Sequence, residues 1–273
     1  MPNLQTFEGA YLWKYVPQLS LSLAFLFLFT IATIVQCWKS WRAKAWFTIP
    51  FLIAGVCEVV GYATRAFCFD KTGSLILYLF QDIFLVLPPI GFAATLYMVY
   101  SRAVRAIRGE ALSPVPMRWA TWIFVGGDWI CLMIQGNAAG LLGNSNLTTI
   151  ADYIIIAGLV LQIMVTIFFI GCCGTFDRRM NIHLRGTGAT TDVPWQASFK
   201  MLYATSTMVL MRNVYRVVEF VSQAVNQEGY LQTREWPLYV FDASLMWLLM
   251  GAFFIWYPSW LPRGTIKYCP GRL

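Results

Sequence analysis

The sequence predicts an all-α membrane protein, a bundle of seven transmembrane helices with an extracellular N-terminus and a cytoplasmic C-terminus. Hydrophobic residues make up 58% of the chain and charged residues 12%, and the mean hydropathy is +0.59. This composition offers too little polar surface to cover a water-soluble globule of 273 residues. Seven long apolar stretches and a one-sided distribution of basic residues point to the same class.

Seven stretches of about 20 predominantly apolar residues match the length that a helix needs to cross about 30 Å of hydrocarbon. The stretches are continuous rather than alternating, which disfavours a β-barrel. Neither an internal repeat nor room for a second folded unit is visible, so residues 1–273 are predicted to form a single membrane domain. The helices are predicted near 18–38, 46–67, 74–101, 117–142, 150–173, 198–225 and 236–258.

Three of these elements have distinctive features. The first stretch follows no basic segment and no cleavage site, which predicts a retained helix rather than a signal peptide. The third contains Pro88-Pro89, which removes two backbone donors and predicts a kink. A hinge or cavity wall and a simple packing kink both remain open there. After the fifth helix, residues 174–195 are rich in Gly, Thr and Arg and are predicted to form a mobile connection.

The placement of the basic residues predicts the orientation. A net charge of +7 could suggest nucleic acid, but the alternation of basic loops gives a better account, so no nucleic-acid partner is expected. One side of the membrane receives 14 basic residues, whereas the other receives Lys14, Arg65, Lys71 and Arg234, which places the N-terminus outside. The glycosylation sequon at Asn146 falls in an outer loop of this topology. The 14 residues are Lys39, Arg42, Lys44, Arg102, Arg105, Arg108, Arg118, Arg178, Arg179, Arg185, Lys200, Arg263, Lys267 and Arg272.

Ionisable residues remain inside the predicted helices, where each costs roughly 2.5–3.5 kcal/mol at the bilayer centre. A rise of about 1.5 Å per residue places five of them roughly 9–14 Å below the outer surface, and Asp128 and Arg212 near 20 Å. Helical spacing puts Arg212, Arg216 and Glu219 on one face, and Glu58, Tyr62 and Arg65 on another. Gln135, Asn137, Gln162 and Tyr239 can join the same interior. The seven charges are Glu58, Asp82, Asp128, Arg212, Arg216, Glu219 and Asp242.

The balance of these charges favours a functional cavity. Five carboxylates face two arginines, which leaves a formal excess of three negative charges. Either some carboxyls are protonated, or the cavity attracts a cation or cationic headgroup, or water enters deeply. From depth alone we predict that Arg212 pairs with Asp128 and that Arg216 pairs with Glu58 or Asp242. The alternative is that the charges pair with one another only to fix helix register.

Several functional classes are disfavoured, and the chain is not expected to be an enzyme. The one histidine, His183, lies in a cytoplasmic loop, whereas seven-helix zinc hydrolases need several within the membrane. The last helix lacks the lysine of retinal proteins, and no phosphate-binding loop occurs. G-protein-coupled receptors usually have an acidic-Arg-Tyr triplet after the third helix and Asn-Pro-x-x-Tyr near the end of the seventh. Here these places read YSRAVR and WYPSW, which disfavours an ordinary receptor of that class. No cofactor is expected, because membrane belts and packing explain the aromatic residues more simply than a haem pocket bounded by Tyr62, Tyr215 and Tyr239.

Six stretches of the predicted helices have a recognisable pattern: EVVGYATR (58–65), PPIGFAATLY (88–97), GDWICLMIQG (127–136), GLVLQ (158–162), RNVYRVVE (212–219) and EWPLYVFD (235–242). These stretches resemble the fungal RTA-like, or lipid-translocating exporter, family of seven-helix membrane proteins. The resemblance covers nearly the full chain, and the R-x-x-Y-R-x-x-E pattern of the sixth helix is its most specific part. Cys131 and Tyr257 depart from the family, which usually has a small hydroxyl residue and a histidine there.

The resemblance implies a plasma-membrane protein linked to export or flipping of sphingoid long-chain bases, to resistance against toxic lipophilic compounds and, in one branch, to porphyrin movement. An acidic cavity with apolar walls suits an amphiphile with an ammonium headgroup and a long hydrocarbon tail, and sphingoid bases have that form. The predicted function is therefore transport or flippase-like export of such amphiphilic membrane lipids.

Alternatives are a seven-helix lipid sensor or receptor with a cytoplasmic partner on the basic loops, a porphyrin- or haem-handling protein, and a membrane component whose charges serve packing alone. The residues predicted to bind ligand are Glu58, Tyr62, Asp82, Asp128, Gln135, Gln162, Arg212, Tyr215, Arg216, Glu219, Tyr239 and Asp242.

Overall fold

The computed structural model describes residues 6–7, 10–11, 18–69, 75–141, 148–187, 195–225, 235–258 and 261. Two short antiparallel strands, β1 (Thr6–Phe7) and β2 (Ala10–Tyr11), precede the helices. The helices are α1 (Leu19–Ala43), the 3-10 turn η1 (Trp46–Thr48), α2 (Ile49–Phe67), α3 (Leu75–Val86), α4 (Pro88–Ala106), the 3-10 turn η2 (Glu110–Leu112), α5 (Met117–Leu141), α6 (Thr148–Thr187) and α7 (Trp195–Val225), followed by α9 (Trp236–Leu238), the π-helical turn η3 (Tyr239–Ala243) and α10 (Ser244–Ile255).

The described helices confirm the predicted all-α membrane bundle and place a helix at each of the seven predicted segments. The third span is divided at Leu87 into α3 and α4, directly before Pro88-Pro89. Five spans are long and apolar enough to cross a membrane by length and composition: 19–43, 46–67, 79–106, 150–186 and 236–255. The other two predicted spans are α5 and α7, helices of 25 and 31 residues that carry more polar side chains. Chain length therefore suffices for crossing in every predicted span.

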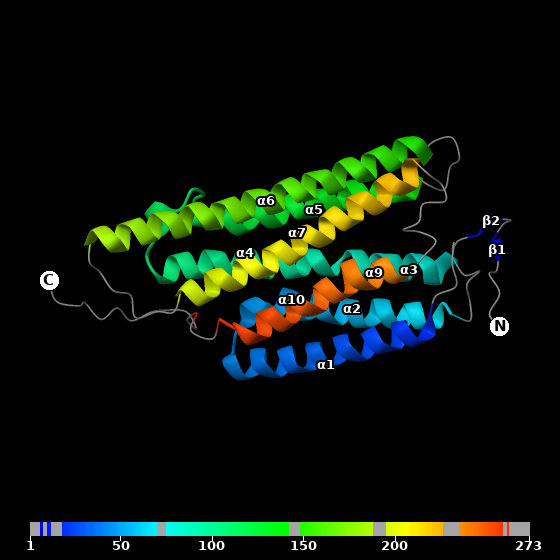
Figure 1. Cartoon of the computed structure of the whole chain (residues 1–273), viewed down its shortest axis with the longest axis horizontal. Coiled ribbons are helices and arrows are strands. Elements are labelled where there is room, and N and C mark those ends of the chain that lie inside the picture. The colour runs from blue at the N-terminus through cyan, green and yellow to red at the C-terminus, as the bar shows by residue number, and fades with distance from the viewer. Residues whose placement is uncertain are drawn as a thin grey trace.

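The helices run roughly along one long axis (Figure 1). Their contacts close into a ring that passes through α1, α2, α4, α5, α6, α7 and α10 and returns to α1. Neighbours in sequence pack against each other, α10 packs on α7 and α1, and α4 lies among α2, α5 and α7. We call the end of the bundle where α1 begins and α2 ends the Arg65 end, and the opposite end the Arg105 end (right and left in Figure 1). The described basic residues outside the spans gather at the Arg105 end, as the predicted orientation requires, and that orientation itself stays a prediction.

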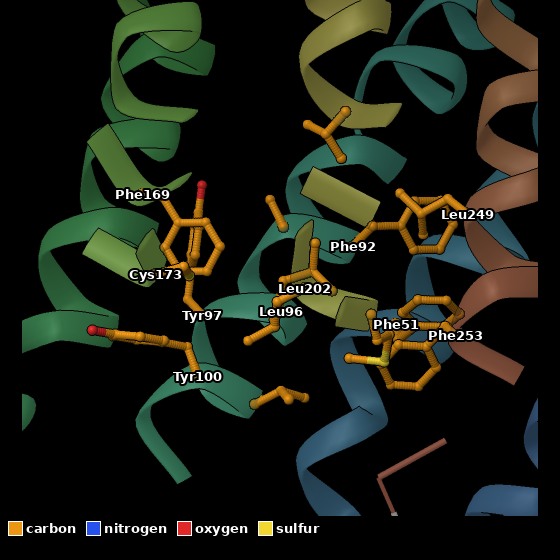
Figure 2. Packing of buried hydrophobic residues seen from close by; sticks show 14 of the residues in the cluster. Phe51, Phe92, Leu96, Tyr97, Tyr100, Phe169, Cys173, Leu202, Leu249 and Phe253 are labelled. Carbon is orange, nitrogen blue, oxygen red and sulfur yellow. The ribbon is translucent and has the colours of Figure 1, made fainter. Parts of the chain in front are cut away.

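Apolar side chains fill the interior toward the Arg105 end. Phe51 of α2 stacks on Phe253 of α10 at 4.3 Å between ring centroids and contacts Phe92 of α4 at 4.7 Å. On the other side of α4, Tyr97 and Phe169 meet edge to face at 4.7 Å, and Leu202 of α7 lies between the two groups (Figure 2). This packing fixes the relative positions of the helices below the polar residues that lie nearer the Arg65 end.

The outer surface of the bundle is apolar, the reverse of a water-soluble protein. Large hydrophobic side chains such as Phe27, Ile76 and Trp122 are 65%, 71% and 74% exposed. Soluble monomers rarely expose contiguous apolar surface on this scale, whereas hydrocarbon chains of lipid cover it at no cost.

The predicted mobile connection after the fifth helix is wrong for residues 174–187. Helix α6 continues through Thr187 and, at 40 residues, reaches about 60 Å, well beyond the hydrocarbon thickness. Phe176 explains the difference, because its buried ring stacks on Phe199 of α7 at 5.3 Å and lies against Gly109 in the connection between α4 and α5. The glycines and arginines of this segment thus belong to a packed helix.

Candidate functional site

Two arginines of α7 share one aspartate of the last span. Arg212 Nε donates to Asp242 Oδ1, and Arg216 Nη2 donates to Asp242 Oδ2 over 2.9 Å. Arg216 Nη1 also donates to Glu219 Oε2 over 3.2 Å, as their separation by three residues allows. The predicted pairing of Arg216 with Asp242 is confirmed. Each buried guanidinium therefore touches a carboxylate that compensates its charge.

Two further carboxylates lie within electrostatic range of this group. Glu58 of α2 is only 3% exposed, interacts through space with both arginines and Asp242, and forms no hydrogen bond or ion pair with any residue that the structure describes. Asp82 of α3 is exposed and interacts with the same three groups. Four carboxylates against two guanidiniums leave a formal excess of two negative charges. We call Glu58, Asp82, Arg212, Arg216, Glu219 and Asp242 the charged cluster.

The charged cluster is bonded to the proline break of the third span. Pro88 and Pro89 have no N–H, so the carbonyls of Phe84 and Leu85, four residues earlier, lose their helical donors. Arg212 Nη2 donates to Leu85 O over 3.0 Å and replaces one of them, as backbone groups in lipid require. Gly61 of α2 allows the close approach there, since a Cβ would lie 2.9 Å from Leu85 Cδ2.

A π-helical turn presents the shared aspartate. Residues Tyr239–Ala243 form η3, in which the Ser244 N–H donates to the Tyr239 carbonyl five residues earlier. The Ser244 hydroxyl donates to the same oxygen over 2.8 Å. Such a turn inserts one extra residue into the helical path and is frequent at functional sites. Here it turns both Tyr239 and Asp242 into the protein interior.

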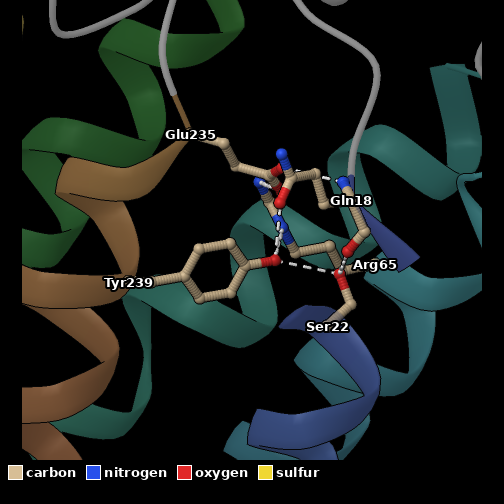
Figure 3. A network of polar contacts seen from close by, with 5 residues as sticks. All are labelled: Gln18, Ser22, Arg65, Glu235 and Tyr239. Atoms are coloured by element: carbon tan, nitrogen blue, oxygen red, sulfur yellow. Dashed lines mark hydrogen bonds and ion pairs between the residues drawn. The ribbon is translucent and has the colours of Figure 1, made fainter. Parts of the chain in front are cut away.

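A second polar group ties α1, α2 and α9 together at the Arg65 end (Figure 3). Arg65 Nη2 donates to Glu235 Oε1 over 2.7 Å, and Arg65 Nε donates to the Tyr239 hydroxyl over 3.1 Å. The Tyr239 hydroxyl donates to Glu235 Oε1 over 3.0 Å and hydrogen-bonds to Ser22 Oγ at 2.9 Å, while the Gln18 N–H donates to Glu235 Oε2 over 2.7 Å. We call Gln18, Ser22, Arg65, Glu235 and Tyr239 the Arg65 network. Arg65 is thus neutralised by Glu235.

Asp128 lies apart from the charged cluster, so the predicted Arg212–Asp128 pair is wrong. The Tyr97 hydroxyl of α4 donates to Asp128 Oδ2 over 2.8 Å, while Arg212 binds Asp242. The predicted pair rested on depth alone, and the depth of a residue does not determine which way its helix is turned about its own axis. Helix α5 packs on α4 and α6, whereas the arginines of α7 face η3. The excess of negative charge near the arginines is accordingly two rather than three.

The remaining predicted site residues are distributed through the bundle. Gln135 Nε2 of α5 lies 3.5 Å from Gln162 Oε1 of α6, so these two amides meet each other. Tyr62 stacks on Phe29 at 5.3 Å, and Tyr215 stacks on Phe241 at 5.6 Å. Asn137 is exposed, and the sequon residue Asn146 lies outside the described residues. A role of any of these side chains in binding a ligand stays a prediction.

Sequence reasoning missed several partners of the site. Neither Tyr97 as the donor to Asp128 nor Ser22 in the Arg65 network was predicted, because uncharged hydroxyls are common in membrane helices and give no signal of their own. The Leu85 carbonyl could have been found, since it lies four residues before Pro89 and needs a donor from another helix.

Comparison with known proteins relates this geometry to one family. The chain is 27% identical to Protein RTA1 of Saccharomyces cerevisiae over 92% of this chain and 86% of that protein. It is 31% identical to Protoporphyrin uptake protein 1 over 75% of this chain and 66% of that protein, and 23% identical to Sphingoid long-chain base transporter RSB1 over 94% and 77%, both from the same organism. No solved structure matches the chain significantly.

The family model described as RTA1 like protein matches residues 51–265, which include the charged cluster and most of the Arg65 network. Together with the apolar spans, this match makes the chain an integral membrane protein. The protein belongs to the RTA1-like family.

Proposed function

We propose that this protein transports amphiphilic lipids that carry an ammonium headgroup, with sphingoid long-chain bases as the substrate class. It acts in the plasma membrane, with the Arg65 end outside, and has no catalytic activity of its own. Export of such compounds would contribute to resistance against lipophilic toxic substances. The similarity to a protein named as a sphingoid long-chain base transporter supports the substrate class.

The negative excess of the charged cluster carries this proposal. Glu58 is buried beside two arginines, yet both are occupied by Asp242 and Glu219, and no described residue pairs with Glu58. An ammonium group would supply the missing positive charge and up to three N–H donors. Asp82, exposed on α3 and within range of Arg216, would meet the same headgroup on its way from the membrane.

The position of the charged cluster along the bundle supports a one-sided path. On the side of α4 that faces α2 and α10, the interior toward the Arg105 end is filled by the aromatic and aliphatic side chains around Phe92 and Phe253, so a cationic headgroup meets no described carboxylate there. An amphiphile would therefore reach Glu58 from the Arg65 half, with its tail against the apolar surface of the spans.

Porphyrin transport is the second candidate, because a relative named as a protoporphyrin uptake protein is 31% identical to this chain. Charge separates the two candidates. A porphyrin with two propionates brings negative charge to a region that already has two carboxylates in excess, whereas an ammonium amphiphile relieves that excess.

Reconstitution tests the proposal. The full chain in liposomes should accelerate movement of a labelled long-chain base across the bilayer over protein-free vesicles. Glu58→Gln removes the free carboxylate but keeps the side-chain volume, and loss of a charge-assisted hydrogen bond worth about 1.5–3 kcal/mol should weaken binding of the base roughly 10- to 100-fold. Glu110→Gln, at a 60% exposed carboxylate outside the spans, is the matched control and should behave as the wild type.

The outcomes are distinct. Equal rates with and without protein would overturn the transport proposal, and binding of the base without movement would identify a lipid sensor instead. Faster movement of protoporphyrin, with no effect on the base, would favour the second candidate.

A further inference from the structure

Asp128 is a buried carboxylate that lacks a cation. It is 2% exposed, and its Oδ1 has no hydrogen-bond partner among the described residues, while Oδ2 accepts only the Tyr97 hydroxyl. No described arginine or lysine forms an ion pair with it, in contrast to Asp242, which holds two. No described basic side chain therefore balances the charge of Asp128, whereas arginines balance that of Asp242 in the charged cluster.

A proton is the simplest counter-charge for this site. An ionised carboxylate surrounded by protein and lipid without a positive partner is strongly unfavourable, so a buried carboxyl binds a proton or a cation instead. The Tyr97 hydroxyl already donates to Oδ2, which leaves Oδ1 as the oxygen to carry the proton. The other titratable groups that face the Tyr97–Asp128 pair are neutral thiols, Cys131 of α5 and Cys173 of α6.

Unpaired polar groups on α7 lie at a similar depth. Asn213 is 1% exposed, and neither its amide oxygen nor its nitrogen has a partner among the described residues. Gly127, next to Asp128, lies against Val165 of α6, and Val217, one turn after Asn213, packs on the Ile155–Leu159 segment of α6. Since α6 runs antiparallel to both neighbours, Asp128 and Asn213 are level to within about a turn.

Asn213 also adjoins Arg212 in the sequence, and Arg216 Nε has no hydrogen-bond partner in the part of the chain that the structure describes. Buried polar atoms that still need hydrogen-bond partners are thus present from the depth of Asp128 to the charged cluster. Water molecules at such atoms would provide a route for a proton, because each can both donate and accept.

We propose that Asp128 is a proton-binding site that couples proton movement to transport. In the state seen here a proton forms an O–H bond at Oδ1 and keeps the side chain neutral. When the helices rearrange and water reaches Asp128, that bond breaks and the proton leaves to water, in exchange for the positive charge of the substrate. The coupling rests on the proposed transport function, whereas the proton site does not.

Infrared spectroscopy of the purified full chain in liposomes tests the proton site directly. A protonated carboxyl has a C=O stretching band distinct from that of a carboxylate. We expect the wild type to show such a band at neutral pH, Asp128→Asn to lose its share of it, and the exposed Glu110→Gln control to keep it. Tyr97→Phe, which keeps the ring but removes the donor, should shift the band to higher frequency and serves if Asp128→Asn fails to fold. An unchanged band in both variants would overturn the proposal.

Transport under an imposed pH difference tests the coupling. The probe is a long-chain base with a trimethylammonium headgroup, which cannot cross as a neutral amine and so does not follow the pH difference by itself. It keeps the positive charge but has no N–H donor for Glu58, so it is used at a higher concentration than the natural base. Exchange of one proton for one cation predicts about tenfold accumulation per pH unit in the wild type and none in Asp128→Asn.

Movement of the probe that ignores the pH difference in the wild type would overturn the coupling while leaving transport intact. A wild type that moves neither the probe nor the natural base would overturn the proposed function, and with it the coupling, while the infrared band still decides the proton site.

Discussion

Asp242→Asn is the sharpest test of the charged cluster. The substitution keeps the size of the side chain but removes the negative charge that Arg212 and Arg216 share, and it replaces one of the two accepting oxygens by an NH2 group that only donates. Arg216 retains Glu219, at 3.2 Å, as a direct partner. Arg212 retains the neutral Leu85 carbonyl, so its charge, 4% exposed as a residue, loses its only described ion pair.

The magnitude follows from that asymmetry. Leaving a buried charge without its partner typically costs about 3–5 kcal/mol. At about 2–4 °C per kcal/mol for a chain of this size, the unfolding temperature should fall by on the order of 10 °C. Tyr97→Phe is the matched comparison, because it removes a single hydrogen bond to Asp128, and with Asp128 protonated as proposed above, loss of a neutral hydrogen bond in a membrane span should cost only about 0.6 kcal/mol.

The assay can use the native thiols of the protein. Cys57, Cys68, Cys131, Cys172 and Cys173 are buried, so a thiol-reactive fluorogenic dye reports unfolding in detergent as they become accessible. Cys37 is exposed, so it reacts with the dye before unfolding and contributes only to the starting fluorescence. If Asp242→Asn lowers the unfolding temperature no more than Tyr97→Phe does, Asp242 does not neutralise the two arginines. The excess of two negative charges in the charged cluster would then be refuted.

Two further predictions concern packing and the Arg65 network. Gly61→Ala should lower the unfolding temperature, since its Cβ would lie 2.9 Å from Leu85 Cδ2, whereas Gly251→Ala, with nothing within 4 Å, should leave it unchanged or raise it by the helix preference of alanine. The reverse order would contradict the close approach of α2 and α3. Tyr239→Phe should cost about 1–3 kcal/mol in the dye assay, because Arg65 loses an acceptor and Ser22 loses a hydrogen-bond partner. A loss matching that of Tyr97→Phe would show that the Arg65 network adds little.

The sequence was sufficient for the fold because hydrocarbon imposes a single requirement on a spanning segment. A run of about 20 apolar residues must be helical, so spans such as 46–67 could be placed almost to the residue. The extension of α6 through Thr187 escaped prediction since it lies outside that requirement. Tertiary contacts such as that between Phe176 and Phe199 stabilise this part of α6, and no local sequence pattern indicates them.

The site was predictable in depth but not in rotation. Spacing along α7 correctly put Arg212, Arg216 and Glu219 on one face, and Arg216 meets Asp242 as depth predicted. Arg212, predicted to lie deeper, meets the same Asp242. Which carboxylate each arginine meets depends on how neighbouring helices turn about their axes. At Asp242 that angle is set by the π-helical turn η3, a feature that is decided by packing rather than by residue type.

Pro89→Ala addresses whether the proline break is a hinge or only a packing kink. Alanine restores an N–H that can donate to the Leu85 carbonyl, so Arg212 would no longer be its sole described donor. Arg212→Gln should then cost less in the Pro89→Ala background than in the wild type, by about 1.5 kcal/mol in a double-mutant cycle. Pro50→Ala is the control, because Pro50 lies in the first turn of α2, where a missing donor breaks no helical bond.

The same variant separates the two interpretations of the break. A hinge predicts that Pro89→Ala slows lipid movement in liposomes while the unfolding temperature holds or rises, because the third span can no longer flex beside the charged cluster. A packing kink predicts unchanged movement. If instead Arg212→Gln costs the same in both backgrounds, the Leu85 carbonyl does not depend on the arginine, and the link between the charged cluster and the proline break is refuted.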